Sequence, residues 1–260
     1  MFGVVPKVLW EQCCEADGLN RIPLTLTCLL IRTANKNILV DTGLGSKEDE
    51  KFHRMFAVER PQTVLNSLKQ LGLGPDDIDI VVNTHLHFDH AGGNTARDSQ
   101  GRLIPTFPRA RYFIQRGEFE DATQANERTK ASYRSDNFLP LADRKSWELL
   151  EGDTEIVPGV TAVVTGGHTR SHQAVKVESA GRVAYFLGDL IPTSSHLPLP
   201  YIMGYDLFPA ATLESKRAVL NQASEAGWLL LFEHDPAIQA GHVRKEGDGR
   251  YRLMEVKVWQ

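Results

Sequence analysis

The sequence has few cysteines, no long apolar run and no excess of basic residues. Its three cysteines, Cys13, Cys14 and Cys28, include an adjacent pair and no Cys-X-X-Cys spacing, which argues against a zinc ribbon or a thioredoxin-type motif. No apolar stretch reaches the roughly 18 residues that a membrane helix needs, and the N-terminus lacks the basic start of a secretory signal. With a formal net charge of −4, the chain lacks the electrostatic basis for gripping nucleic acid. We therefore expect a cytoplasmic protein with reduced thiols that binds neither membrane nor nucleic acid.

The length and the apolar patterns favour one α/β domain. At 260 residues, with 42% hydrophobic and 24% charged residues, the chain can bury a large core, and we expect a single domain over residues 1–260. Residues 24–32 and 38–40 predict an antiparallel hairpin, and short apolar runs predict strands over 78–82, 160–164, 174–177, 183–187 and 228–232. Helical spacing predicts a short helix within 47–60, a helix that opens at Pro61 and a helix over 211–226.

One six-residue motif is dense in metal ligands. The run His85-Leu86-His87-Phe88-Asp89-His90 places three imidazoles and a carboxylate directly after an apolar strand. Imidazoles this close would repel one another when protonated and bury unpaired nitrogens when neutral, so a cation that accepts their lone pairs is the economical explanation. On an extended strand His85, His87 and Asp89 would share one face, whereas His90 needs a different backbone direction. The motif therefore predicts the metal site of a hydrolase.

Three more candidate ligands, His168, Asp189 and His234, each follow an apolar run and a small or polar spacer. Functional side chains gather where strands leave the core, so we expect these three to join the first cluster and complete a set of seven ligands. Asp41 and Thr84 are candidates to orient the imidazoles, and a turn cap is an equal alternative for Asp41.

With these residues in place, the sequence closely resembles the metallo-β-lactamase superfamily from Asp41-Thr42-Gly43 to His234. The resemblance implies an αββα sandwich of two mixed sheets flanked by helices. By matching position, it implies that His85, His87 and His168 hold one metal ion. It likewise implies that Asp89, His90 and His234 hold the second, and that Asp189 bridges both. Imidazole and carboxylate donors without a thiolate suit two divalent ions, Zn²⁺ first, and tolerate Fe, Mn or Co.

The resemblance also implies a function, that of a dinuclear metallo-hydrolase. A metal-bridging hydroxide would attack an ester, lactone or phosphotriester, and Asp89 is the candidate to return the proton to the leaving group. The compact length is most similar to the lactonase and methyl-parathion-hydrolase branch. Lactonases of this superfamily usually carry a Tyr shortly after the bridging Asp, but residues 190–193 here are Leu-Ile-Pro-Thr. Tyr201, Tyr205 and Phe208 in the following loop are the substrate-binding candidates, and its apolar and aromatic character favours a hydrophobic small molecule.

Two other functions fit the same first cluster. A persulfide dioxygenase-like oxidoreductase would use a single iron and leave His90 and His234 without a metal. A glyoxalase II-like thioesterase would be a hydrolase with a different substrate. The number of bound metal ions distinguishes the oxidoreductase from the hydrolase, because two metals per chain favour hydrolysis and one iron favours oxidation. Members of the superfamily often dimerise, so a homodimer stays open.

Overall fold

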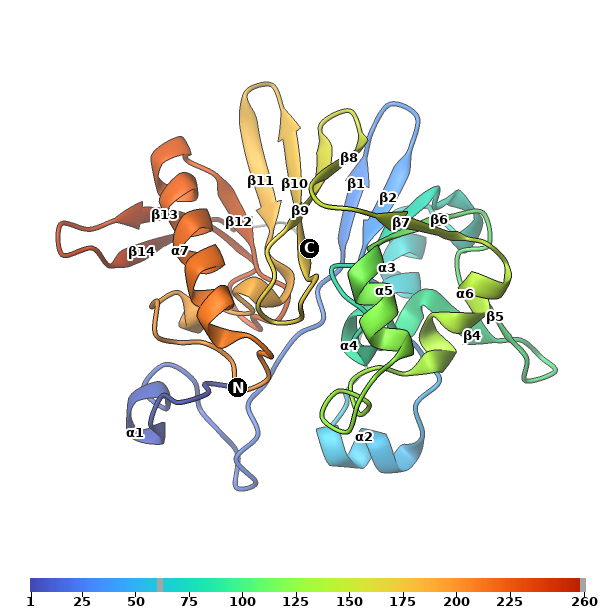
Figure 1. The fold of residues 1–260 in the computed structure, drawn as a ribbon, viewed down its shortest axis with the longest axis horizontal. Coiled ribbons are helices and arrows are strands. Elements are labelled where there is room, and N and C mark those ends of the chain that lie inside the picture. Colours follow the sequence, from blue (N-terminus) through green and yellow to red (C-terminus); the bar gives the residue numbers. More distant parts are fainter. Residues whose placement is uncertain (60–62, 258–260) are drawn as a thin grey trace. The chain divides into compact units, whose positions relative to one another are not determined.

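The structure is a computed structural model that describes residues 1–59 and 63–257 of the chain. It consists of two compact units (Figure 1). We call Cys28–Leu150 the central unit, and Met1–Thr27 together with Glu151–Gln260 the terminal unit. Each unit has its own sheet, and the ligand motif of residues 85–90 belongs to the central unit.

The central unit is built on a five-stranded mixed sheet in the order β1-β2-β3-β6-β7. Strands β1 and β2 form the predicted antiparallel hairpin, and β2, β3, β6 and β7 run parallel to one another. A separate hairpin pairs β4 with β5. The strands are β1 (Leu29–Arg32), β2 (Asn37–Val40), β3 (Ile80–Val82), β4 (Thr95–Arg97), β5 (Leu103–Pro105), β6 (Arg111–Gln115) and β7 (Trp147–Leu150).

Helices of the central unit fill the connections between its strands. They are α2 (Glu50–Phe56), α3 (Val64–Gln70), α4 (Phe88–Ala91), α5 (Arg116–Thr123) and α6 (Leu139–Asp143), with the 3₁₀ turns η1 (Pro75–Asp77), η2 (Gly92–Asn94) and η3 (Ser135–Asn137). Leu68 of α3 packs with Leu39 and Val81 of the sheet, and this contact fixes the crossover from β2 to β3. Pro61, predicted to open α3, lies outside the described residues.

The terminal unit is built on a seven-stranded sheet in the order β14-β13-β12-β11-β10-β9-β8. Only β11 and β12 pair in parallel, and the other neighbours are antiparallel. The strands are β8 (Thr154–Val157), β9 (Val160–Val164), β10 (Gln173–Ser179), β11 (Arg182–Phe186), β12 (Leu229–Leu231), β13 (Ala240–Lys245) and β14 (Tyr251–Glu255).

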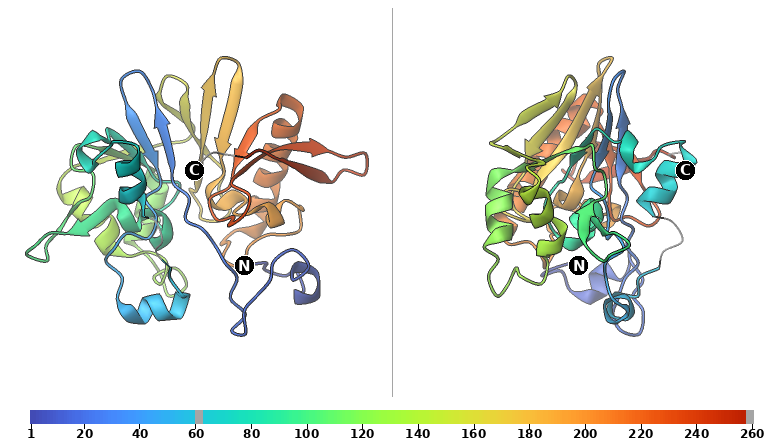
Figure 2. Two further views of the ribbon diagram at one scale, coloured as in Figure 1. Left: turned by 180° about the vertical axis from the view of Figure 1, so that it is seen from behind. Right: turned by 90° about the vertical axis from the view of Figure 1, so that its right-hand side faces the viewer.

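One long helix covers part of this seven-stranded sheet (Figures 1 and 2). Helix α7 (Pro209–Ala226) carries Val219, Leu220 and Ala223 on one face, and these pack with Tyr185 and Leu230 of the sheet. The helix connects β11 to β12, as a parallel strand pair requires. The other elements of the unit are α1 (Lys7–Trp10), η4 (Gly188–Leu190) and η5 (Ser194–His196).

One predicted boundary is wrong for a physical reason. Strand β1 begins at Leu29, whereas the sequence pattern predicts a strand from residue 24. The N–H groups of Thr25 and Thr27 donate instead to the carbonyls of His234 and Glu233, at 3.2 and 3.0 Å. Residues 24–27 therefore belong with the segment that carries a candidate ligand. Among the described residues, no helix is both long and apolar enough to cross a bilayer.

Candidate metal centre

The segment that carries the first ligands leaves the sheet at the carboxyl end of β3. Because β2 and β3 are parallel, Asp41 after β2 and Thr84 after β3 emerge at the same edge of the sheet. His87 still has extended backbone, and helix α4 begins directly after it with Phe88. This helical turn gives His90 the change of direction that an extended strand would deny it. The ring of His85 consequently lies 4.0 Å from that of His90 and 4.5 Å from that of His87.

Two glycines let the chain pack tightly behind α4. A Cβ added at Gly92 would lie 2.3 Å from the carbonyl oxygen of Leu44, and one added at Gly93 would lie 2.3 Å from that of Thr42. The N–H of Gly93 donates to the carbonyl of Gly43 at 3.0 Å. Residues 42–45 therefore approach the backbone of η2 more closely than any side chain would permit.

Asp41 lies at the centre of a buried hydrogen-bond network. Its Oδ1 accepts the N–H of Thr84 at 2.8 Å, and its Oδ2 accepts the Thr84 hydroxyl at 2.7 Å. The same Oδ2 lies 3.0 Å from Nδ1 of His90. Since a carboxylate can only accept, Nδ1 of His90 carries the proton and Nε2 is the atom left for other partners. Asp41 and Thr84 thus make the contacts expected of residues that orient an imidazole; their part in metal binding stays a prediction.

Glu118 of α5 was not identified from the sequence, yet it supports the same segment. Its side chain is fully buried, and its Oε1 accepts the N–H of Leu86 at 3.1 Å and the hydroxyl of Tyr133 at 2.9 Å. Leu86 lies between two candidate ligands, so Glu118 fixes the backbone on which both are mounted. The ring of Tyr133 also lies 4.9 Å from that of His87.

Asp89 is the most accessible of the four acidic or imidazole groups in the motif. Its side chain is 28% exposed, whereas that of His90 is fully buried. The Oδ2 atom of Asp89 lies 3.8 Å from Nε2 of His90, on the side of the ring opposite to Asp41. A carboxylate in this position lies near the candidate ligand His90 and can also exchange protons with solvent.

The second set of candidate ligands lies at one edge of the seven-stranded sheet. Strand β9 is antiparallel to β10, β10 is antiparallel to β11, and β11 is parallel to β12, so β9, β11 and β12 all point the same way. His168, Asp189 and His234 follow these three strands and therefore emerge together. Asp189 lies in the middle of the three. Its Oδ2 is 3.0 Å from Nε2 of His168, and its Oδ1 is 2.9 Å from Nε2 of His234.

In each imidazole of this second set, the other ring nitrogen lies within hydrogen-bonding distance of an oxygen atom. Nδ1 of His234 lies 2.8 Å from the carbonyl oxygen of Thr25, and Nδ1 of His168 lies 2.9 Å from Oδ1 of Asp206. Burial lowers the pKa of His168, but Asp189 and Asp206 outweigh burial and raise that pKa to about 10. His172 supports Asp189 itself, since the N–H of Asp189 donates to Nε2 of His172 at 3.1 Å. Asp206 was not assigned a ligand-supporting contact from the sequence.

The donor chemistry of both sets fits divalent transition metals. The atoms offered are imidazole nitrogens and carboxylate oxygens, with no thiolate, which is the composition of many zinc sites. His90, His168 and His234 each have Nδ1 beside an oxygen partner, so Nε2 is directed away from that partner. Metal-binding histidines are typically held in this way.

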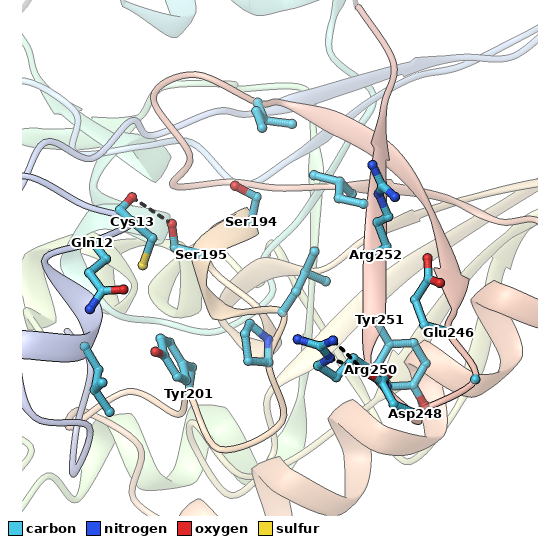
Figure 3. A pocket seen from close by; sticks show the side chains of 16 residues that line it. Gln12, Cys13, Ser194, Ser195, Tyr201, Glu246, Asp248, Arg250, Tyr251 and Arg252 are labelled. Carbon is cyan, nitrogen blue, oxygen red and sulfur yellow. Dashed lines mark hydrogen bonds and ion pairs between the residues drawn. The ribbon is translucent and has the colours of Figure 1, made fainter.

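The three substrate-binding candidates lie in different surroundings. Tyr205 is 61% exposed, and Phe208, the N-cap residue of α7, is 40% exposed beneath the guanidinium of Arg170. Tyr201 lines a surface pocket of about 920 Å³ in the terminal unit (Figure 3). The α1 region contributes Cys13 to this pocket, and the β14 hairpin contributes Arg252. Their role in substrate binding stays a prediction.

An aromatic cluster lies beside the ligand motif in the central unit. Phe52 of α2 is buried, with its ring 4.4 Å from that of Phe56 and 5.2 Å from that of Phe88. The guanidinium of Arg134 lies 5.0 Å over the ring of Phe52. Met55 and Phe56 of α2 are 58% and 50% exposed. The helix predicted within residues 47–60 therefore has an apolar surface next to Phe88, which lies between two candidate ligands in sequence.

Comparison with known proteins places the chain among metal-dependent hydrolases. The N-acyl homoserine lactonase AiiA of Bacillus thuringiensis subsp. kurstaki is 29% identical over 224 residues, which cover 82% of each chain. The crystal structure of a probable metal-dependent hydrolase from Staphylococcus aureus matches with a TM-score of 0.88 and 33% identity, over 99% of this chain and 92% of that one. A structure of an N-acyl homoserine lactone hydrolase, with the product N-hexanoyl-L-homoserine bound at its catalytic metal centre, matches with a TM-score of 0.64 and 26% identity. This match covers 87% of this chain and 88% of that one.

These relatives confirm the predicted fold class and the predicted class of enzyme, a hydrolase. The family model described as the metallo-beta-lactamase superfamily matches residues 22–234, which is most of the sequence. By this match, the chain belongs to the metallo-beta-lactamase superfamily.

Proposed function

We propose that this protein is a dinuclear metal-dependent hydrolase that opens a lactone or cleaves an ester bearing an apolar group. The observation that carries the proposal is the position of Asp189, whose two carboxylate oxygens each lie about 3 Å from a different imidazole. A carboxylate placed in this way is suited to two ions at once. The proposal assigns seven ligands to the two ions, namely His85, His87 and His168 to one, Asp89, His90 and His234 to the other, and Asp189 to both.

The bound ions would supply two kinds of chemistry, a water molecule with a pKa lowered towards neutrality and polarisation of the substrate carbonyl. The residues of the chain supply the rest. Asp41 holds the ring of His90 through Nδ1, so that Nε2 is presented in a fixed direction. Asp89, at 28% exposure, is the group proposed to hand a proton to the leaving oxygen. Glu118 keeps the backbone between His85 and His87 in place.

The proposed substrate class is supported by the apolar surface of α2 and by the relatives. Phe56 is half exposed with its ring 5.6 Å from that of Phe88, and its neighbour Met55 is also exposed. Such a surface favours a hydrophobic acyl or alkyl group over a sugar or a nucleotide. Relatives of this chain include an N-acyl homoserine lactonase, a protein that acts on a lactone with an acyl chain. We therefore place N-acyl lactones first among the substrates, followed by aryl esters, thioesters and phosphotriesters.

The test is metal analysis of the purified protein joined to a hydrolysis screen over these four substrate classes. We expect two divalent ions per chain and hydrolysis of at least one class. Asp189→Ala should lose two-metal occupancy together with turnover, whereas Asp98→Asn, a change at an exposed turn, should leave both intact. One iron per chain with oxygen-dependent activity would overturn the proposal in favour of an oxidoreductase. Full activity of Asp189→Ala with one metal would contradict the ligand assignment.

A further inference from the structure

Asp206 makes a direct contact with His168. The side chains of Asp206 and His168 are 1% and 2% exposed, and Oδ1 of Asp206 lies 2.9 Å from Nδ1 of His168. Because the carboxylate accepts, Nδ1 keeps its proton, and a metal ion that displaces the other ring proton would meet the lone pair of Nε2. That Nε2 is the atom next to Asp189. The two nitrogens of the His168 ring therefore lie next to different carboxylates, Nδ1 next to Asp206 and Nε2 next to Asp189, the candidate bridging ligand.

The backbone next to Asp206 is hydrogen-bonded to the segment that follows strand β9. The N–H of Leu207 donates to the carbonyl of His168 at 3.0 Å, and the N–H of Phe208 donates to the carbonyl of Gly167 at 2.8 Å. A Cβ at Gly167 would lie 2.3 Å from Oγ1 of Thr212 in the first turn of α7, so the two segments are in van der Waals contact. The carboxylate thus has little freedom to leave His168.

A buried lysine holds the preceding part of the loop. Lys216 of α7 is 1% exposed, and its Nζ donates to the carbonyl of Pro198 at 2.8 Å and to that of Tyr201 at 2.9 Å. Further along, the N–H of Asp206 donates to the carbonyl of Met203 at 3.2 Å. The loop that delivers Asp206 is consequently fixed at both of its ends, by α7 on one side and by the end of β9 on the other.

We propose that Asp206 is a positioning residue, which accepts the Nδ1 proton of His168 and thereby directs Nε2 of that ring to the metal. Lys216 contributes indirectly by holding the loop that carries Asp206. The inference rests on the proposed function, because it concerns the affinity of the metal that His168 would bind. Outer partners of metal-binding histidines typically change metal affinity 10- to 100-fold when they are removed.

The experiment measures zinc affinity by competition with a chromophoric chelator, for the wild type and for Asp206→Ala, Asp206→Asn and the control Asp98→Asn, which lies in the turn between β4 and β5. We expect Asp206→Ala to weaken the affinity of one zinc ion by roughly 10- to 100-fold. Asp206→Asn should weaken it less, because an amide oxygen still accepts from Nδ1. Lys216→Met should show a smaller loss in the same direction, and Asp98→Asn should show none.

A second readout separates positioning from a merely structural role. In the zinc-loaded protein, long-range ¹H–¹⁵N spectra of the histidine side chains identify which ring nitrogen carries the proton, and His168→Gln assigns the signals of His168. We expect the Nδ1–H signal of His168 to persist in Asp206→Asn and to shift or vanish in Asp206→Ala. If Asp206→Ala only lowers the melting temperature, with zinc affinity and the Nδ1–H signal unchanged, the inference is overturned.

The outcomes also distinguish this inference from the proposed function. A wild-type protein that takes up no zinc would overturn both. Two bound zinc ions without hydrolysis of any substrate class would overturn the function, while the affinities of the Asp206 variants would still decide the inference. Normal zinc uptake and hydrolysis, with equal zinc affinity in the wild type and Asp206→Ala, would overturn the inference alone.

Discussion

Two buried carboxylates, Asp41 and Asp206, hold imidazole rings by the same means. Each places one oxygen 2.9 to 3.0 Å from Nδ1 of a histidine, His90 in the central unit and His168 in the terminal unit. A neutral imidazole has only one N–H, so an acceptor at Nδ1 decides which nitrogen remains a ligand. The two differ in their sequence context, because Asp41 directly follows strand β2, whereas Asp206 lies in a loop before α7.

Glu118 provides a prediction about the backbone between two ligands. In Glu118→Ala, the buried N–H of Leu86 loses its acceptor, which should lower the free energy of unfolding by about 1–3 kcal/mol. The metal content should fall with it. Urea unfolding and metal analysis measure the two effects, with Glu118→Gln as the control because its amide oxygen can accept the same bond. Equal stability and equal metal content in the alanine variant and the wild type would refute the role assigned to Glu118.

Lys216 provides a prediction about pH. Burial lowers the pKa of Lys216 from its ordinary value of 10.5 to about 7, with Asp206 acting in the opposite direction. Between these two values the folded state holds a neutral amine while the unfolded state holds an ammonium, so the unfolded state binds more protons and stability rises with pH. A neutral amine still has two protons for the carbonyls of Pro198 and Tyr201.

Replacing Lys216 with Met should therefore remove this rise. We expect the free energy of unfolding of the wild type, relative to Lys216→Met, to increase from pH 7 to pH 10 in urea titrations. Lys51→Met, at an exposed position of α2, serves as the control and should leave the pH dependence unchanged. A constant difference between wild type and Lys216→Met across that range would show that the ammonium is retained in the folded state.

At the scale of residues, the sequence identified the candidate ligands that stand together or follow a strand. The motif of residues 85–90 is visible without any fold, because its spacing alone brings imidazoles together. Glu118 and Asp206 were not identified, because Glu118 lies within helix α5 and Asp206 lies in a loop before α7, so neither directly follows a predicted strand. Nothing in their local pattern separates them from ordinary polar residues.

At the scale of elements, strand direction explains why the second set of candidate ligands comes together. Apolar runs predicted β9, β11 and β12 as strands, and the structure confirms all three. Their order in the sheet and their common direction come from pairings between residues far apart in sequence, which periodicity does not encode. Helix α4 could not be predicted from the sequence either, because its four residues are too few to show a helical period.

The close approach behind α4 leads to a prediction about this element. Gly92 has an ordinary negative φ, so an alanine there would be strained only by its Cβ, 2.3 Å from the carbonyl oxygen of Leu44. Forcing a methyl group into a packed region typically costs about 1–3 kcal/mol. Gly92→Ala should therefore unfold at lower urea and bind metal less well.

Gly247→Ala is the matched control for this change. A Cβ at Gly247 meets nothing within 4 Å, so the same substitution should leave urea unfolding and metal content close to those of the wild type. Equal destabilisation of the two variants would mean that loss of glycine itself, rather than the contact with Leu44, causes the effect.

At the scale of the whole molecule, family membership and local structure agree on a hydrolase with mixed sheets and flanking helices. The expectation of one domain over residues 1–260, the cytoplasmic location and the homodimer stay predictions. The chain contributes four candidate ligands from the central unit and three from the terminal unit.

This division of the ligands leads to a prediction about overall stability. A metal that binds the folded but not the unfolded chain stabilises the fold by about 2.7 kcal/mol when its free concentration is a hundred times its Kd. Adding zinc to the metal-free protein should therefore raise the melting temperature, and a chelator should reverse the shift. In Asp189→Ala most of this response should disappear, because both ions lose a shared ligand, whereas Asp98→Ala should respond like the wild type. Scanning calorimetry at fixed protein concentration measures the shift, and a wild-type melting temperature that is indifferent to zinc and chelator would contradict the proposed centre.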